Sequence, residues 1–404
     1  MNDELEVYHW LDSLGFPDLA RCPTVRVATG AWSVHTPGAP QKTFLQGFLV
    51  ADDGQRFEVF LPDELTTRSF RRTDATATLL EAVYHKPGDL REDQQRWWEQ
   101  RRAHFDSAHE WAPYNPVHAG AFICECCLRA WACFKAGLPE LASQAFACAR
   151  TIHAAAEVNP PGRSLRQHVS DEIAHLLMWQ AIQAFGDPTI SRRELLGRFE
   201  HILDRFPISA EVAPNQDERF GWVVGRHTQQ AQEAVTLLRR IIAEDDERAR
   251  RPVRPLQELP RQEQIAELIF HLRDQNGRQT CQPGSCRVFA DERGEQSPAH
   301  QLVRLGFDAV PQLIDALEDE RFTRSVGFYR DYCFSHHVLR VGDCALEILE
   351  QIAGRTFWQG TYTNAAMVKD GQAAQTKQLV LAWWNEVQRD RDRQPTTEPE
   401  RPGE

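Results

Sequence analysis

The chain has 404 residues, of which 42% are hydrophobic and 26% are charged, and its formal net charge at pH 7 is −12. This composition excludes a disordered protein and a collagen-like protein, and the length allows two or three domains. Non-specific affinity for a phosphate backbone comes from Lys and Arg side chains. We therefore do not expect nucleic acid as a partner of this acidic chain.

The N-terminal segment is acidic, and no apolar run of signal-peptide length follows it. No stretch of the chain approaches the roughly 20 consecutive apolar residues that span a bilayer. We expect a cytoplasmic protein without a membrane partner. In that compartment the ten cysteines should be reduced thiols.

The first 88 residues predict a small β-rich module. A short helix is expected over residues 4–14. Residues 24–28, 42–50 and 56–60 are rich in β-branched and aromatic residues, as strands are. The last two segments are separated by Asp52-Asp53-Gly54-Gln55, whose Asp-Gly step favours a hairpin turn.

The rest of the chain predicts helices. Ala, Leu, Glu, Arg and Gln recur at helical spacing, and short to medium helices broken by Gly or Pro are expected within residues 128–152, 169–185, 192–206 and 228–243. The charged run over residues 244–251 leads into Pro252, Pro255 and Pro260. Such a run indicates a domain boundary near residue 252.

Two segments of the C-terminal half repeat each other. Residues 265–274 align with residues 310–319 at an offset of 45, and both contain Leu-Ile-x-x-Leu-x-Asp. Each is followed, after a long insertion, by a second apolar helix. The pattern therefore predicts a helix-loop-helix unit of about 45 residues.

Residues 309–319 and 341–349 resemble the two helices of a HEAT repeat, and the resemblance covers residues 261–354. Two features depart from that family. Gly342 stands where the family usually has Arg, which removes the usual partner of the turn Asp, and the inter-helix turn has 22 residues. Small and aromatic residues upstream are spaced as in a tetratricopeptide repeat, at Gly137, Ala142, Phe146 and Ala149 and again at Leu195, Phe199, Ile202 and Pro207.

These resemblances imply a mainly α fold, namely an α-α solenoid of HEAT-like and tetratricopeptide-like helical hairpins with a small β-rich N-terminal module. The expected parts are the module over residues 1–88 and a tetratricopeptide-like region over 89–251. HEAT-like units with a capping helix follow over 252–388, and a disordered tail over 389–404. Surfaces of such solenoids bind proteins or peptides, so the resemblance implies a protein or peptide partner.

The insertion over residues 321–340 contains four Arg, two His and five aromatic residues. One interpretation is a surface that recognises an anion or a protein partner, because Arg supplies planar forks and aromatic rings supply rigid contact area. The alternative is a long turn with a small core of its own, whose Arg side chains pair with nearby acids. The partner-binding candidates are Arg324, Arg330, His336, His337 and Arg340.

The insertion over residues 275–296 occupies the equivalent place in the preceding unit. Insertions at equivalent repeat positions fall on one face of a solenoid. Cys281 and Cys286 of this insertion, together with His336 and His337, could hold zinc across the two loops. Their spacing differs from that of the paired knuckles of zinc ribbons.

Two further groups of side chains have the chemistry of metal ligands. Cys124, Cys126 and Cys127 share a predicted helix with apolar residues and fit a core stripe. His168, Glu172 and His175 could point the same way from one helix, but they do not form the His-Glu-x-x-His pattern. The motifs of serine hydrolases and of nucleotide-binding loops are absent.

The sequence therefore favours a non-catalytic protein-binding scaffold that acts through its two long loops and needs no cofactor. The alternative is a zinc-binding enzyme or metal sensor built on the same loops.

Overall fold

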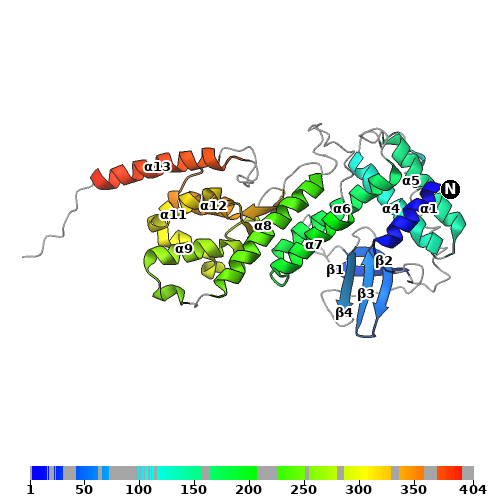
Figure 1. Cartoon of the computed structure of the whole chain (residues 1–404), viewed down its shortest axis with the longest axis horizontal. Helices are drawn as coiled ribbons and strands as arrows, with labels where there is room; N and C mark the ends of the chain where they lie inside the picture. Colours follow the sequence, from blue (N-terminus) through cyan, green and yellow to red (C-terminus); the bar gives the residue numbers. More distant parts are fainter. Residues whose placement is uncertain are drawn as a thin grey trace, which may run out of the picture. The chain divides into compact units, whose positions relative to one another are not determined.

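The structure is a computed structural model. It describes residues 2–15, 17, 22, 24–30, 42–61, 66–71, 99, 102–103, 105–107, 110, 112, 116–135, 137–156, 164–206, 226–250, 254–279, 286–328, 336–358 and 371–393. The described chain is mainly helical with small sheets (Figure 1). In these ranges no helix is both long enough and apolar enough to cross a membrane.

The chain divides into two compact units. Unit 1 contains Met1–Met178 and His201–Gln230, and unit 2 contains Trp179–Glu200 and Ala231–Glu404. The predicted boundary near residue 252 falls within unit 2. The four-part division drawn from the sequence stays a prediction.

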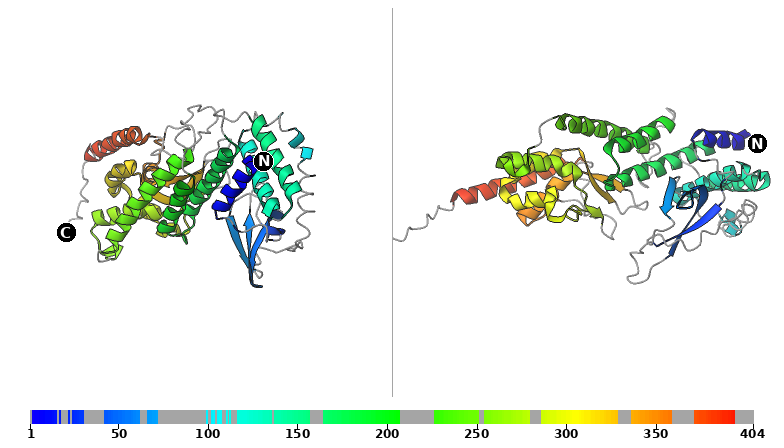
Figure 2. Two further views of the ribbon diagram at one scale, coloured as in Figure 1. Left: turned by 45° about the vertical axis from the view of Figure 1, so that its right-hand side comes forward. Right: turned by 90° about the horizontal axis from the view of Figure 1, so that it is seen from below.

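Unit 1 begins with a helix and a four-stranded antiparallel sheet. The elements are α1 (Asn2–Ser13), β1 (Thr24–Gly30), β2 (Lys42–Asp52), β3 (Arg56–Leu61) and β4 (Thr66–Arg71). The sheet order is β1-β2-β3-β4, and both views of Figure 2 show this meander. The helix and the first three strands confirm the sequence prediction for this segment.

The turn between β2 and β3 has the chemistry that its Asp-Gly step predicts. Gly54 has a φ of +83°, which favours glycine, and its N–H donates to Asp52 Oδ1 at 3.0 Å. Asp53 Oδ1 accepts from the N–H of Gln55 at 2.8 Å. One face of the sheet then buries Phe57, Val59 and Leu61.

The helices of unit 1 form a buried core with α1. They are α4 (Pro116–Lys135), α5 (Pro139–Ala155) and the first part of α6 (Leu165–Gln183). Gly137, with a φ of +72°, separates α4 from α5. Tyr8 of α1 stacks on Phe134 at 4.9 Å between ring centroids, and Trp131 Nε1 donates to Asp12 Oδ1 at 2.8 Å.

The cysteines of α4 belong to this core, as the apolar stripe predicted. Cys124, Cys126 and Cys127 are buried. Burial raises the pKa of the Cys126 and Cys127 thiols, and it raises the pKa of Cys133 to about 12. The Cys126, Cys127 and Cys133 thiols are therefore protonated at neutral pH and unreactive.

Unit 2 contains helices, short strands and 3-10 turns. Its remaining elements are η3 (Ala184–Gly186), α7 (Arg192–Arg205), α8 (Arg226–Arg248), η5 (Leu256–Glu258), α9 (Arg261–His271), η6 (Leu272–Asp274), β5 (Arg278–Gln279), β6 (Cys286–Arg287), η7 (Gly294–Gln296), α10 (Pro298–Leu305), η8 (Gly306–Asp308), α11 (Val310–Asp315), η9 (Ala316–Glu318), β7 (Phe322–Phe328), β8 (His336–Arg340), α12 (Val341–Ala353) and α13 (Ala373–Arg393). The last five residues of α7 and the first five of α8 belong to unit 1.

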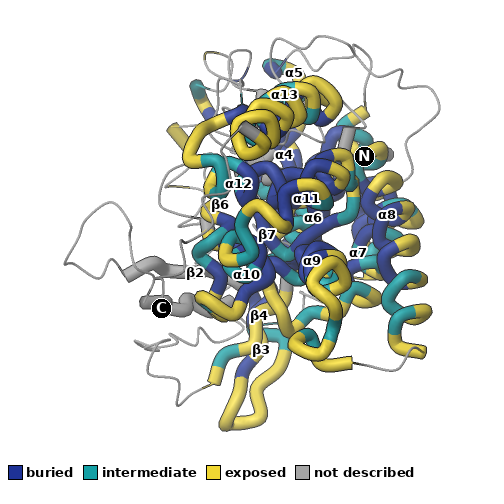
Figure 3. Tube along the Cα trace, turned by 90° about the vertical axis from the view of Figure 1, so that its left-hand side faces the viewer, coloured by how far each residue is buried: buried dark blue, intermediate teal, exposed yellow. Residues whose placement is uncertain are grey.

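The two repeated segments of the sequence have the same local structure. Both α9 and α11 run directly into a 3-10 turn, at η6 and η9. Their apolar residues enter one core, in which α10 packs against α9 and α12, and α11 packs against α12. Figure 3 shows α12 as mostly buried and much of α13 as exposed.

The helix α13 covers part of this core through Val380 and Trp384, which are both buried. This placement fits the predicted capping helix. The helix continues to Arg393, so the predicted disordered tail from residue 389 is wrong for its first five residues. The charged residues there contain no helix breaker, and the first one is Pro395.

The sequence did not predict the strands β5 to β8. Each insertion contains an antiparallel pair, β5 with β6 and β7 with β8. Only two residues pair in each strand of the first hairpin, which is too short for alternation to be recognised.

Two Gly→Ala substitutions in unit 2 should have opposite effects. A Cβ at Gly277 would lie 2.7 Å from Arg287 O and 2.9 Å from Val288 Cα, which are both backbone atoms. Gly277→Ala should lower the free energy of unfolding by about 1–3 kcal/mol. A Cβ at Gly197 in α7 meets nothing within 4 Å, so Gly197→Ala should raise it by up to about 1 kcal/mol.

Urea titration of both variants and the wild type tests this prediction. An equal change in the two variants would contradict the close backbone approach at Gly277.

Candidate functional site

The two insertions, which the sequence places on one face, are in direct contact. The carbonyl oxygen of Gln275 accepts from the Arg324 N–H at 3.0 Å and from Ser325 Oγ at 2.9 Å. The Gly277 N–H donates back to Ser325 Oγ at 2.8 Å. Gln275 itself is fully buried, and its side chain bonds Val288 O and the Ala299 N–H. These bonds join the two hairpins into one layer.

Arg324, the first predicted binding residue, bonds backbone atoms of unit 2. Its Nη1 donates to Ile190 O at 2.9 Å and to Asp187 O at 3.4 Å, in the turn that follows η3. The side chain is half-buried, and burial, with the neighbouring charge of Arg192, lowers the pKa of Arg324. The guanidinium thereby holds the hairpin against this turn.

Arg340 and His337 are internal, with exposed fractions of 4% and 3%. Arg340 forms an ion pair with Glu233 of α8, and its guanidinium lies 3.9 Å from the Phe322 ring centroid. The His337 ring packs on Gly327, where an added Cβ would lie 2.8 Å from Cε1.

The other two predicted binding residues are outside what the structure describes. Arg330 lies in the segment 329–335, and of His336 only the backbone, at the start of β8, is described. Across the described part of the insertion, the contacts favour the alternative in which Arg side chains anchor a packed turn. The binding role of these five residues stays a prediction.

A buried ion-pair network lies behind the hairpins. Arg273 is 1% exposed, and its Nη2 donates to Asp245 Oδ1 at 2.8 Å while its guanidinium lies 3.6 Å from the Phe270 ring centroid. Arg192 of α7 bonds Asp245 Oδ2 at 3.0 Å and Asp274 Oδ1 at 2.7 Å. Burial alone would raise the pKa of Asp274, but the hydrogen bonds and charges of His271 and Arg192 hold it below its usual range.

The same network supplies partners for both turn aspartates of the repeated segments. Asp274 pairs with Arg192, and Asp319 pairs with Arg321, which also donates to Glu244 Oε2 at 2.9 Å. Asp319 therefore has a cationic partner even though position 342 is a glycine. The Gly342 N–H instead donates to Asp319 O at 3.1 Å.

Cys286, one of the four zinc candidates, is buried beside Ser325 and Glu347. Burial, followed by the charge of Glu347, raises the pKa of its thiol to about 12. Zinc takes a thiolate, so binding here would have to displace this proton. Cys281 lies outside the described residues. Among those the structure describes, no group of three His, Cys, Asp or Glu side chains is arranged to hold a metal.

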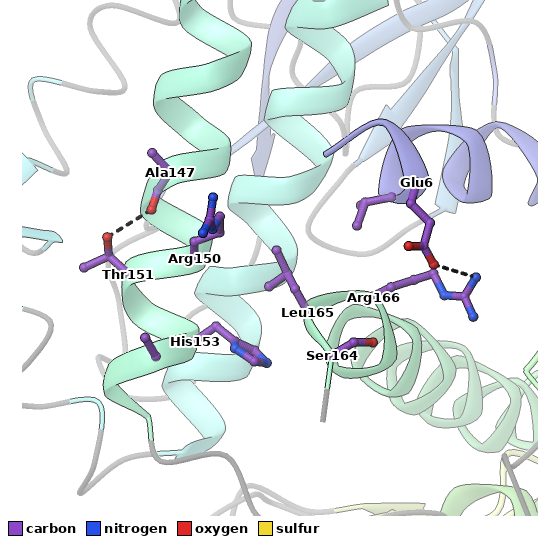
Figure 4. Close-up of a pocket in the computed structure, with 10 residues that line it drawn as sticks. Glu6, Ala147, Arg150, Thr151, His153, Ser164, Leu165 and Arg166 are labelled. Carbon is purple, nitrogen blue, oxygen red and sulfur yellow. Dashed lines mark hydrogen bonds and ion pairs between the residues drawn. The ribbon is translucent and has the colours of Figure 1, made fainter. Parts of the chain in front are cut away.

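A cavity in unit 1 is the second candidate site, and the sequence did not predict it. It has a volume of about 690 Å³. Its walls come from α1, α5 and the start of α6 (Figure 4), and the lining residues are Glu6, Val7, Ala147, Arg150, Thr151, His153, Ala154, Ser164, Leu165 and Arg166. They come from two parts of the chain, residues 6–7 and residues 147–166.

Of the two histidines that the sequence singled out, His168 lies next to this cavity. His168 and Glu172 are buried, with His168 Nε2 at 4.0 Å from Glu172 Oε1, whereas His175 is exposed. The His168 ring packs edge-on against His153, at 5.4 Å between centroids. His153 then lines the cavity.

Comparison with protein-family models, with curated proteins and with solved structures finds no match to this chain.

Asp245 and Asp246 are adjacent acids of α8 with different arginine partners. Replacing each partner by Ala should lower the free energy of unfolding by different amounts. Arg273→Ala removes a buried cation from Asp245 and should lower the free energy of unfolding by about 3 kcal/mol. Arg193→Ala removes an exposed cation from Asp246 and should cost less than about 1 kcal/mol. Chemical denaturation measures both, and equal costs would contradict a structural role of the buried network.

The stability of the protein should fall with rising pH because of Glu347. Burial, followed by the charge of Glu350, raises the pKa of Glu347 from 4.5 to about 8. Between these two values the folded state holds a proton that the unfolded state has released. The free energy of unfolding therefore falls as pH rises, by at most about 1.4 kcal/mol per pH unit.

Glu347→Gln should remove this dependence, so that the variant is nearly as stable as the wild type at pH 5 and more stable at pH 9. Denaturation midpoints across that range measure the effect. Glu386→Gln, at an exposed position of α13, serves as the control. Parallel profiles for wild type and Glu347→Gln would contradict the raised pKa.

Proposed function

We propose that this chain is a non-catalytic protein-binding scaffold, built as an α-α solenoid, that binds its partner through an aromatic surface at the end of unit 2. The observation that supports this proposal is the exposed Phe307 ring, which lies among aromatic side chains of α13. We name this surface, in which Phe307, Trp383 and Arg391 lie around the buried Trp384, the aromatic patch.

The patch is a contiguous set of ring contacts. Phe307 is 36% exposed and stacks on Trp384 with centroids 5.8 Å apart. Trp383 lies 6.3 Å from Phe307 and 5.4 Å from the buried Phe357. The Arg391 guanidinium lies 4.8 Å from the Phe307 centroid. Rings fixed in this way lose little conformational entropy when a partner covers them.

The composition of the patch is that of binding hot spots. Trp, Tyr and Arg dominate the energetics of protein interfaces, and Phe is enriched in their centres. Arg391 stacks one face on Phe307 while the residue as a whole stays exposed. We therefore propose a protein partner that covers Phe307 with an apolar side chain and places a carboxylate against Arg391.

The joined insertions add support of a different kind. Because the hydrogen bonds at Gln275 fix the two hairpins to each other, the described parts of both insertions form one rigid layer. A scaffold needs surfaces that stay in place without a partner.

A pair of charge reversals on α13 tests the proposal. Arg391→Glu reverses the charge in the patch, and Arg389→Glu makes the same change at another exposed position of the helix. We expect Phe307→Ala combined with Arg391→Glu to reduce partner capture from the source-cell extract at least about tenfold, because hot-spot truncations cost above about 1 kcal/mol each. Arg389→Glu should capture the partner as the wild type does.

The readout is quantitative mass spectrometry, with circular dichroism to show that each variant is folded. Equal capture by all three proteins, or no partner with the wild type, would overturn the proposal.

A further inference from the structure

The cavity of unit 1 is distinct from the aromatic patch and has different chemistry. Its volume of about 690 Å³ lies within the usual range of small-molecule sites, about 300–1,000 Å³. Arg150 lines it on α5, the ion pair of Arg166 with Glu6 lines it on α6 and α1, and apolar residues complete the lining (Figure 4).

One wall carries Arg150 of α5. No ion pair joins Arg150 to another of the described residues, and its side chain is exposed. The other wall carries Arg166 at the start of α6, which pairs with Glu6 of α1 at 3.2 Å (Figure 4). The side chains of this pair are 46% and 60% exposed, and such surface pairs contribute about 0–1 kcal/mol. Arg166 can therefore exchange Glu6 for a ligand anion at little cost.

Between the two arginines the cavity is bordered by the first turn of α6. Ser164 caps this helix, since its Oγ accepts from the Gln167 N–H at 3.2 Å and Gln167 Oε1 accepts from the Ser164 N–H at 2.9 Å. Leu165 and Arg166 follow at the first two helical positions, where backbone N–H groups have no acceptor within the helix. These donors add to the attraction of the guanidinium groups for an anion.

His153 and the apolar residues supply the remaining wall. The His153 side chain projects from α5 toward Ser164 and Leu165 (Figure 4). Its ring is supported by His168, which lies beside the buried Glu172. Val7, Ala154 and Leu165 add apolar surface to the lining.

We propose that this cavity binds a phosphate monoester of a small organic molecule. The cationic side chains that line the cavity come from different helices, Arg150 from α5 and Arg166 from α6. A tetrahedral, doubly charged phosphate can accept from more than one guanidinium, whereas a planar carboxylate satisfies one guanidinium fork. The organic part of the ligand then lies against Val7, Ala154 and Leu165. This inference is independent of the aromatic patch.

Phosphorus-31 NMR titration of the full chain with phenyl phosphate tests the proposal. Phenyl phosphate should bind more tightly than inorganic phosphate, which lacks the apolar part, and more tightly than benzoate, which lacks the tetrahedral anion. Ligand-observed proton NMR reports on benzoate and on phenol, the uncharged control. Binding should weaken as salt is added.

Arg150→Gln and Arg166→Gln should each weaken phenyl phosphate binding at least about tenfold, because each removes charge-assisted hydrogen bonds. Arg102→Gln, at an exposed arginine of unit 1 that pairs with Asp106, is the matched control and should bind as the wild type does. Absence of binding at millimolar phenyl phosphate would overturn the proposal. So would equal affinity for benzoate, or unchanged affinity in both cavity variants.

Discussion

The guanidinium of Arg273 is the charge on which the arrangement of unit 2 depends. A cation that is almost completely buried destabilises the folded state unless acids and carbonyls surround it. Asp245 and Glu244 of α8 and the Phe270 carbonyl of α9 meet this requirement. Arg192 of α7 joins the same network through its ion pairs with Asp245 and Asp274. Helices α7, α8 and α9 are therefore held in one arrangement by charge pairing, in addition to the apolar core that α9 to α13 share.

The helices and strands of this chain could be predicted from its sequence more completely than the contacts of its charged side chains. Residue spacing gave the strands around Gly54 and the helices α6 to α8, because periodicity and turn chemistry are local properties. The repeated Leu-Ile-x-x-Leu-x-Asp segments likewise fold alike. The partners of the Arg side chains, however, lie far from them in the sequence. Arg340 meets Glu233 across 107 positions of sequence, and nothing in the insertion indicates that partner.

One of the two candidate sites is marked by an unusual sequence, and the other is not. The unusual composition of residues 321–340 attracted a binding interpretation, but the same residues satisfy the needs of a packed hairpin through Arg324, His337 and Arg340. The cavity of unit 1 has no such sequence signal. Its two arginines are separated by the whole connection between α5 and α6, and Glu6 comes from the first helix. Only the His168–Glu172 pair, which lies behind the cavity, was visible as a pattern.

Unit 2 is discontinuous in sequence, and this has a consequence for its synthesis. Residues Trp179–Glu200 are synthesised well before the segments that they contact. Arg192 pairs with Asp274, and the carbonyl oxygens of Asp187 and Ile190 accept from Arg324. Long-range contacts of this kind form late and slow folding. A fragment that begins near residue 252 would lack Arg192, Glu233 and Asp245 altogether. Arg192, Asp245 and Glu233 can therefore form these ion pairs only after η6 and β8 have been synthesised.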